Sequence, residues 1–183
     1  SDVQFVGNGE TVYFGHKMED AHPPHESRLT VSKIFATSSN VGTSRIIYNN
    51  YAKRPQDFID KLHSFGLGTP LGLQIKGEGQ PLVKNTTDKS WSGISLPWIS
   101  IGYESKLTPL QILAFYNAVA NNGRMIRPKF VKEVRHRGQL VHSYPTEIIR
   151  DSIASQVALA KVRGLMEGVV QYGSGAVLNK SPY

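Results

Sequence analysis

The chain has 183 residues, a formal net charge of +7, 39% hydrophobic and 19% charged residues, which is the composition of an ordinary globular protein of about one domain. No apolar run approaches the roughly 20 residues of a membrane-spanning helix, and the N-terminus carries no secretory signal pattern. The lack of cysteine excludes disulfides, thiolate nucleophiles and cysteine-based metal sites.

The positive charge would suit an anionic partner such as nucleic acid, a membrane surface or an anionic polymer. However, the basic residues are scattered along the chain. The densest cluster, Lys129, Lys132, Arg135 and Arg137, supplies only four charges on a predicted hairpin. We therefore expect a solvated basic surface and no nucleic-acid partner.

The N-terminal part of the chain is predicted to form a hairpin followed by a loop. Residues 3–15 suggest two strands that turn at Asn8-Gly9, a pair that favours tight turns. Residues 16–28 form a polar segment with two prolines and three histidines. Beside Asp20 and Glu26 these histidines, His16, His22 and His25, could bind a metal. The prolines and the lack of helical spacing favour an ordinary loop, so we expect no metal and no cofactor.

Three helices are predicted next. Thr30 is a suitable N-cap for the first, and a second helical pattern runs to about residue 52. Pro55 fits the first position of the third helix, which Gly66 ends. Residues 69–100 are rich in turn residues and predict a long loop that Trp91 and Trp98 hold in place.

A central core helix is predicted within residues 99–123. Thr108 and Gln111 have the spacing of a capping box. Ile112, Tyr116 and Val119 would share its buried face. Residues 129–144 predict a second hairpin with its turn at residues 137–139, and a long helix is predicted from about residue 152 to 172, after which residues 173–175 form a flexible exit.

A Ser-x-Asn triplet, Ser38 to Asn40, lies at the junction of the first two predicted helices. A hydroxyl and a carboxamide two residues apart on a tight turn can both point into one cleft. Serine and asparagine between helices are also common simply as caps, and from the triplet alone a cap is the more frequent explanation.

Five segments in a fixed order favour a functional site over a simple cap. Together they resemble the transpeptidase domain of class B penicillin-binding proteins, especially the cell-division type. Lys33–Gly42 is similar to the second motif of that family and its surroundings. The other segments that carry the resemblance are Phe65–Gly68, Ser100–Tyr103 with Leu107–Gln111, Asn122–Arg124 with Arg127-Pro128, and Gly173–Gly175. The resemblance covers most of residues 26–178.

The chain also departs from the family pattern. It contains no S-x-x-K nucleophile motif, since Thr30-x-x-Lys33 and Thr86-x-x-Lys89 match only with threonine. It contains no K-[ST]-G motif either, since Lys180-Ser181-Pro182 lacks the glycine, and Glu104 stands where the family usually has glycine. The chain also opens on Ser1 without a methionine. We therefore expect residues 1–183 to be a partial transpeptidase domain, bounded by the two missing motifs.

The resemblance implies an α+β fold, mainly helical, with two small β-hairpins and most of the family's five-stranded central sheet outside the chain. It implies a peptidoglycan D,D-transpeptidase that cross-links stem peptides by serine acyl transfer and binds penicillin. Ser38 would relay a proton and Asn40 would bind the amide of the substrate or β-lactam, so both are assigned as catalytic residues. Ser39 is assigned with Asn40 to substrate binding, although its middle position favours a structural role. No cofactor is implied, and the chain alone, without the nucleophile, should be inactive.

The implied partners are stem peptides ending in D-Ala-D-Ala, β-lactams and divisome proteins, and the chain could self-associate through an exposed sheet-facing surface. The implied location is the periplasmic face of the inner membrane at the septum, with an anchoring N-terminal helix that this chain lacks. Two alternatives stay open: a non-catalytic basic helical module that binds an anionic polymer or protein, and a serine β-lactamase, which shares the three motifs.

Overall fold

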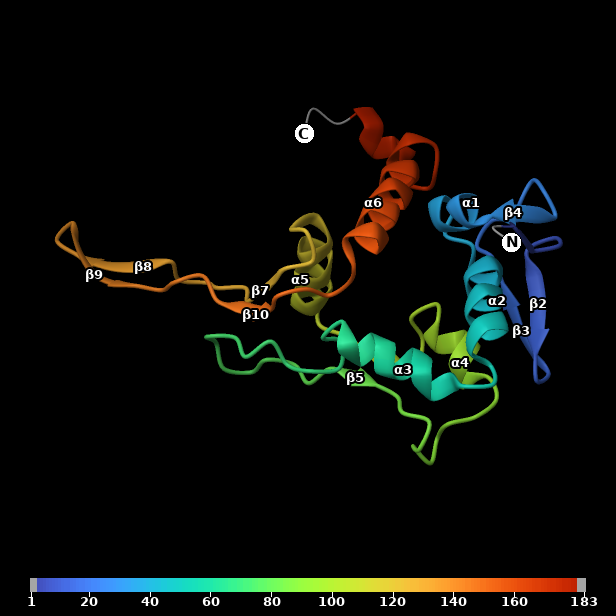
Figure 1. Cartoon of the computed structure of the whole chain (residues 1–183), viewed down its shortest axis with the longest axis horizontal. Helices are drawn as coiled ribbons and strands as arrows, with labels where there is room; N and C mark the ends of the chain where they lie inside the picture. The colour runs from blue at the N-terminus through green and yellow to red at the C-terminus, as the bar shows by residue number, and fades with distance from the viewer. Residues whose placement is uncertain (1–2, 181–183) are drawn as a thin grey trace. The chain divides into compact units, whose positions relative to one another are not determined.

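The computed structural model describes residues 3–180, so Ser1, Ser181 and Pro182 lie outside the described part of the chain. The fold is α+β and mainly helical with small hairpins, as predicted (Figure 1). The chain divides into two compact units. Within the described residues, the first combines 3–60, 84–105 and 160–180, and the second combines 61–83 and 106–159.

Two pairs of short strands begin the first unit. β1 (Val3–Phe5) pairs antiparallel with β4 (Arg28–Thr30), and β2 (Glu10–Tyr13) pairs antiparallel with β3 (His16–Glu19). The prediction of a single hairpin over residues 3–15 is therefore wrong. The chain does turn near Gly9, but the β2–β3 hairpin turns at Phe14 and Gly15, which both have positive φ angles of 49° and 82°.

Several helices complete the first unit. They include α1 (Val31–Ala36), α2 (Asn40–Tyr51) and α4 (Ser95–Ile99), the start of α3 (Pro55–Ser64), the end of α6 (Gln156–Gln171) and a 3-10 helix, η1 (Ala176–Lys180). A small core of Val6, Leu29, Ile34 and Val41 joins β4, α1 and α2. The start of α1 is capped as predicted, because the Thr30 side chain accepts a hydrogen bond from the Lys33 N–H.

The predicted long loop over residues 69–100 is wrong in part. The segment contains β5 (Leu82–Val83) and α4, and Trp98 lies within α4. The Trp98 indole packs edge-on against the Tyr13 ring, with 6.3 Å between ring centroids, so this tryptophan does hold the segment in place.

The second unit contains α5 (Pro109–Ala120), β7 (Met125–Ile126), β8 (Glu133–His136), β9 (Gln139–Ser143) and β10 (Ile148–Arg150), while β6 (Ser105–Lys106) lies at its boundary with the first. β7 pairs antiparallel with β10, and β8 pairs antiparallel with β9. The predicted second hairpin is confirmed, and its turn residues Arg137 and Gly138 have φ angles of 48° and 83°. Among residues 3–180 every sheet has two strands.

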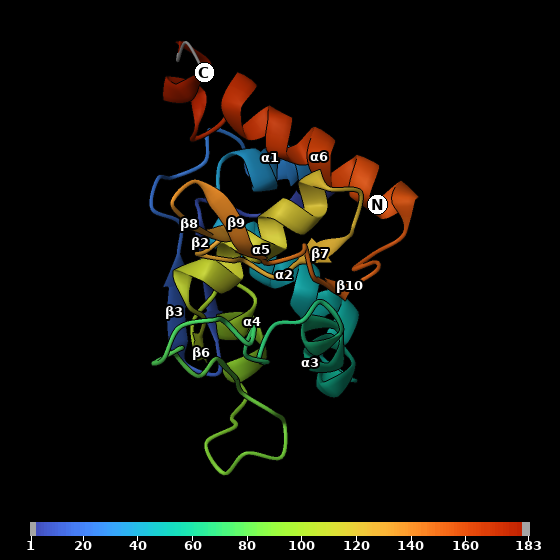
Figure 2. The same cartoon turned by 90° about the vertical axis from the view of Figure 1, so that its left-hand side faces the viewer.

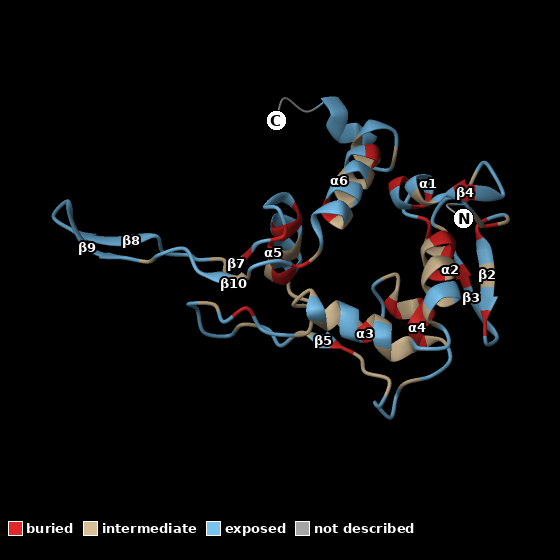
Figure 3. Cartoon of the chain, viewed as in Figure 1, coloured by how far each residue is buried: buried red, intermediate tan, exposed pale blue. Residues whose placement is uncertain are grey.

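The capping box predicted for α5 is confirmed, but the predicted buried face is wrong. Of its three predicted members only Val119 is buried, whereas Ile112 and Tyr116 are 44% and 48% exposed. The buried stripe instead follows Gln111, Ala114 and Ala118. Gln111 donates a hydrogen bond to the Thr69 carbonyl at 2.9 Å. Figure 3 colours α5 with both buried and exposed residues.

No helix within residues 3–180 combines the length and the apolar character needed to cross a bilayer.

Candidate functional site

Ser38 occupies the turn between α1 and α2 in a strained backbone conformation. Its φ angle is +56°, which is uncommon for a residue other than glycine. The Ser38 N–H donates to the Phe35 carbonyl at 3.2 Å and the Ser39 N–H donates to the Ile34 carbonyl at 3.0 Å, so the end of α1 fixes the turn. Ser38 is exposed, and within residues 3–180 its hydroxyl has no hydrogen-bond partner. A fixed backbone thus presents a free hydroxyl.

Ser39 points the other way and is buried. Its hydroxyl oxygen accepts a hydrogen bond from the Gly42 N–H at 2.9 Å, so Ser39 is the N-cap of α2. Its hydroxyl donates to Asp20 Oδ2 at 2.8 Å, and Asp20 Oδ1 accepts from the Val41 N–H at 2.9 Å. One carboxylate therefore holds both the cap and the first turn of the helix, where a negative charge is favourable.

Asn40 is the first residue of α2 and is half-buried. Its Nδ2 donates to the Glu19 carbonyl at 2.9 Å, which ties it to the end of β3. The cap hypothesis for the triplet is therefore right for Ser39 rather than Asn40. The Asn40 amide oxygen has no hydrogen-bond partner in the part of the chain that the structure describes.

Close backbone contacts bring a third segment to this turn. A Cβ added at Gly42 would lie 2.6 Å from the Ile34 side chain, so α1 and α2 approach each other closely there. The end of α6 meets α1 through the Ser174 N–H, which donates to the Ala36 carbonyl at 2.8 Å (Figure 2). A Cβ at Gly173 would lie 2.2 Å from that same carbonyl oxygen. The segment predicted as a flexible exit is thus hydrogen-bonded beside the triplet.

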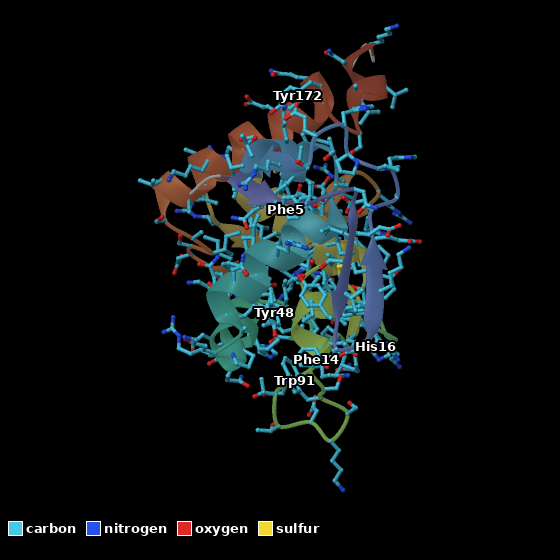
Figure 4. The ribbon with its side chains drawn as sticks, turned by 90° about the vertical axis from the view of Figure 1, so that its right-hand side faces the viewer. Phe5, Phe14, His16, Tyr48, Trp91 and Tyr172 are labelled. Carbon is cyan, nitrogen blue, oxygen red and sulfur yellow. The ribbon has the colours of Figure 1, made fainter. Side chains whose placement is uncertain are left out.

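A cavity of about 430 Å³ lies next to the triplet in the first unit. Its walls are the loop from Asp20 to Glu26, one side of α1, and Tyr172 to Ser174 after α6. Figure 4 labels Tyr172 near the end of α6. Ser39 is the member of the triplet that contributes to the wall. Lys33 donates to Glu26 at 2.7 Å on the rim, where both side chains are about half exposed, so this pair contributes little stability.

The three predicted metal-ligand candidates do not come together. His22 and His25 line the cavity, whereas the His16 ring packs edge-on against Trp98 with 6.4 Å between centroids. Among residues 3–180 no group of three histidine or carboxylate side chains is arranged to hold a metal ion.

The role of Asp20 was missed by sequence reasoning, which treated it only as a neighbour of the histidines. Its partners lie 19 and 21 positions away in the sequence. Sequence motifs that depend on neighbouring residues cannot predict a contact over such a separation.

The profile of the penicillin binding protein transpeptidase domain matches residues 4–183. The chain belongs to this family. The resemblance inferred from motif order is therefore confirmed at the level of the family. Glu104, which the resemblance places where glycine is usual, has a φ angle of +55°, a conformation that favours glycine. Here Glu104 pairs with Lys84 at 2.6 Å.

Two curated relatives of this transpeptidase domain are similar over most of the chain. It is 32% identical to penicillin-binding protein PbpB of Mycobacterium tuberculosis over 86% of this chain and 22% of that protein. It is 28% identical to peptidoglycan D,D-transpeptidase FtsI of Escherichia coli over 89% of this chain and 25% of that protein. The chain thus spans about a quarter or less of the length of these relatives.

Solved structures agree with this assignment. The apo crystal structure of penicillin binding protein 3 from Mycobacterium tuberculosis superposes with a TM-score of 0.74 at 28% identity, over 96% of this chain and 40% of that one. The transpeptidase domain of penicillin-binding protein 3 from Burkholderia pseudomallei gives a TM-score of 0.74 at 22% identity, over 94% of this chain and 47% of that one, which shows a shared fold.

Proposed function

We propose that residues 1–183 are part of the transpeptidase domain of a peptidoglycan D,D-transpeptidase. The parent protein would cross-link stem peptides that end in D-Ala-D-Ala and would bind penicillins as substrate analogues. The observation that carries this proposal is the family match over residues 4–183. The geometry agrees with it, because the Ser38 hydroxyl has no hydrogen-bond partner among residues 3–180 and lies on a turn that the Ser39–Asp20 hydrogen bond anchors.

The proposed reaction begins with a serine nucleophile that the parent protein supplies from outside these 183 residues, which contain no S-x-x-K motif. Its oxygen attacks the carbonyl of the penultimate D-Ala, and the C–N bond to the terminal D-Ala breaks. The leaving nitrogen must gain a proton. Ser38 would pass that proton on, since a hydroxyl donates and accepts at once.

Asn40 would bind the substrate amide through its side-chain oxygen, whose partner position is open among residues 3–180. Ser39, assigned with Asn40 to substrate binding, uses both its donor and one acceptor position within the fold. Its contribution would therefore be to fix the positions of its two neighbours.

The same proposal extends to location and partners. The parent would act at the periplasmic face of the inner membrane, anchored by an N-terminal helix, and would work with divisome proteins at the septum. No cofactor is needed for acyl transfer by a serine.

The test of the proposal is the acylation rate of the intact parent protein by a fluorescent penicillin. Ser38→Ala should slow acylation by more than about tenfold, as expected for loss of a proton-transfer group. Ser32→Ala, on the exposed side of α1, is the matched control and should react at the wild-type rate. An unchanged rate for Ser38→Ala would restrict Ser38 to a structural role.

The chain alone should form no covalent adduct with the fluorescent penicillin. Acylation at any of its serines would contradict the proposal that the nucleophile lies elsewhere. The serine β-lactamase alternative predicts rapid nitrocefin hydrolysis by the parent protein, whereas a transpeptidase should stay acylated.

A further inference from the structure

The β8–β9 hairpin of the second unit is exposed along its whole length. Every residue of both strands is solvent-exposed, and Figure 3 draws the hairpin entirely in the colour of exposed residues. Three aliphatic side chains on it, Val134, Leu140 and Val141, are 43% to 63% exposed. An isolated two-stranded hairpin is only marginally stable in water. This one therefore presents apolar surface with little burial to stabilise it.

The charged residues of the hairpin are mostly basic. From Lys129 to Tyr144 the sequence has four basic residues and one acidic residue, a formal charge of +3 with histidine neutral. Glu133 is already paired with Arg135 at 2.7 Å. Lys132 and Arg137 have no ion-pair or hydrogen-bond partner for their side chains within residues 3–180. Both cations are therefore available to an anionic partner.

Its backbone leaves two strand edges open. β8 and β9 pair only with each other in the described part of the chain, so each strand has one outer edge without a partner. The register shifts between Val134 and Arg135, which marks a bulge. Charges and bulges can serve simply to protect such an edge from aggregation. However, that explanation does not account for three exposed aliphatic residues beside the charges.

We propose that the β8–β9 hairpin is a docking arm for an acidic, extended protein segment, which adds as a strand to an open edge. Backbone hydrogen bonds would supply affinity, as in other cases of strand addition. Lys132 and Arg137 would select acidic side chains, and Val134, Leu140 and Val141 would contact apolar residues at alternate positions. A polyanion without a peptide backbone would use only the charges, and would leave both the edge and the aliphatic side chains unused.

The probe is a fluorescein-labelled synthetic peptide that alternates glutamate with valine, and binding to the 183-residue chain is measured by fluorescence anisotropy. We expect saturable binding that weakens as salt is added, because the cations contribute through screened charge. The double variant Lys132→Glu with Arg137→Glu should bind about tenfold or more weakly. The matched control, Lys89→Glu with Lys161→Glu, makes the same charge change on exposed residues outside the hairpin and should bind as wild type.

Strand pairing is tested by the same peptide with N-methyl groups on alternate amides, which keeps the side chains but removes backbone donors. Loss of binding for this peptide supports strand addition. Equal binding of the two peptides would overturn the proposal. So would displacement of the peptide by a sulfated polysaccharide if N-methylation had no effect, because the arm would then be a non-specific cationic surface. Equal loss in the two double variants, or no binding to wild type, would also overturn it.

Discussion

A half-buried carboxylate fixes the orientation of the candidate site. Asp20 accepts hydrogen bonds from the Ser39 hydroxyl and from the Val41 N–H, so the middle residue of the triplet faces inward. Because Ser38 adopts a φ angle of +56° immediately before that anchor, its side chain is directed away from the core. The strain at Ser38 and the cap at Ser39 therefore act together to expose one hydroxyl.

Tyr13 supplies a residue-scale prediction about pH. The side chain is buried, and burial raises the pKa of the Tyr13 phenol above its ordinary value, although its hydrogen bond with the Ser44 hydroxyl opposes the shift. The folded protein therefore keeps this proton at a pH where the unfolded chain has lost it. The contribution of Tyr13 to the free energy of unfolding is therefore fully present below about pH 10, the usual tyrosine pKa. It is lost as the pH rises through the higher pKa of the folded state.

The measurement is a titration followed by tyrosinate absorbance, with wild type compared to Tyr13→Phe. The difference between the two curves should titrate above about pH 10 in the folded protein and near that value in urea. A difference curve that is the same with and without urea would contradict the burial argument.

At the scale of elements, two glycines in helices should respond to alanine in opposite ways. One lies where α1 and α2 cross closely, and the other lies in α6 with open space beside it. Gly42→Ala places a Cβ 2.6 Å from the Ile34 side chain, so we expect a loss of about 1–3 kcal/mol in the free energy of unfolding from overpacking. Gly164→Ala, in α6, meets no heavy atom within 4 Å and should stabilise the protein by about 0.5–1 kcal/mol through helix propensity. Urea denaturation of both variants measures the difference, and a neutral Gly42→Ala would mean that α1 can move aside.

The elements also separate what a sequence can predict from what it cannot. The Thr30 cap, the Thr108–Gln111 capping box and the Arg137-Gly138 turn were predicted correctly because each depends on residues within three positions of one another. The pairing of β1 with β4 was missed, since it joins segments about 25 positions apart and leaves no periodic trace. The triplet was located by motif order, whereas its anchor, Asp20, was visible only in three dimensions.

The orientation of α5 shows the same division. Its limits follow from local signals, but its buried face does not. The spacing of Ile112, Tyr116 and Val119 predicted one buried face. The buried face instead includes Gln111, which donates a hydrogen bond to the Thr69 carbonyl 42 positions away. Hydrophobicity alone therefore gives the helix and leaves its rotation undetermined.

For the whole molecule, the exposed apolar face of α5 predicts self-association of this chain. Ile112, Leu113 and Tyr116 are each about half exposed on one helix, and contiguous apolar surface of this kind favours an interface. The net charge of +7 opposes association of two copies by mutual repulsion. Added salt screens that repulsion and leaves the hydrophobic contact intact, so the self-association should strengthen with ionic strength.

Sedimentation velocity over a range of protein concentrations, at low and high salt, checks this prediction. Leu113→Lys should shift the chain to monomer at both salt concentrations, because it places a charge in the centre of the apolar face. Val12→Lys, an exposed position on β2 in the first unit, should associate as wild type. The salt dependence separates this surface from the β8–β9 arm, where charge attraction should weaken as salt is added. A chain that stays monomeric at every concentration, or that dissociates as salt rises, would show that the face of α5 does not bind a second copy.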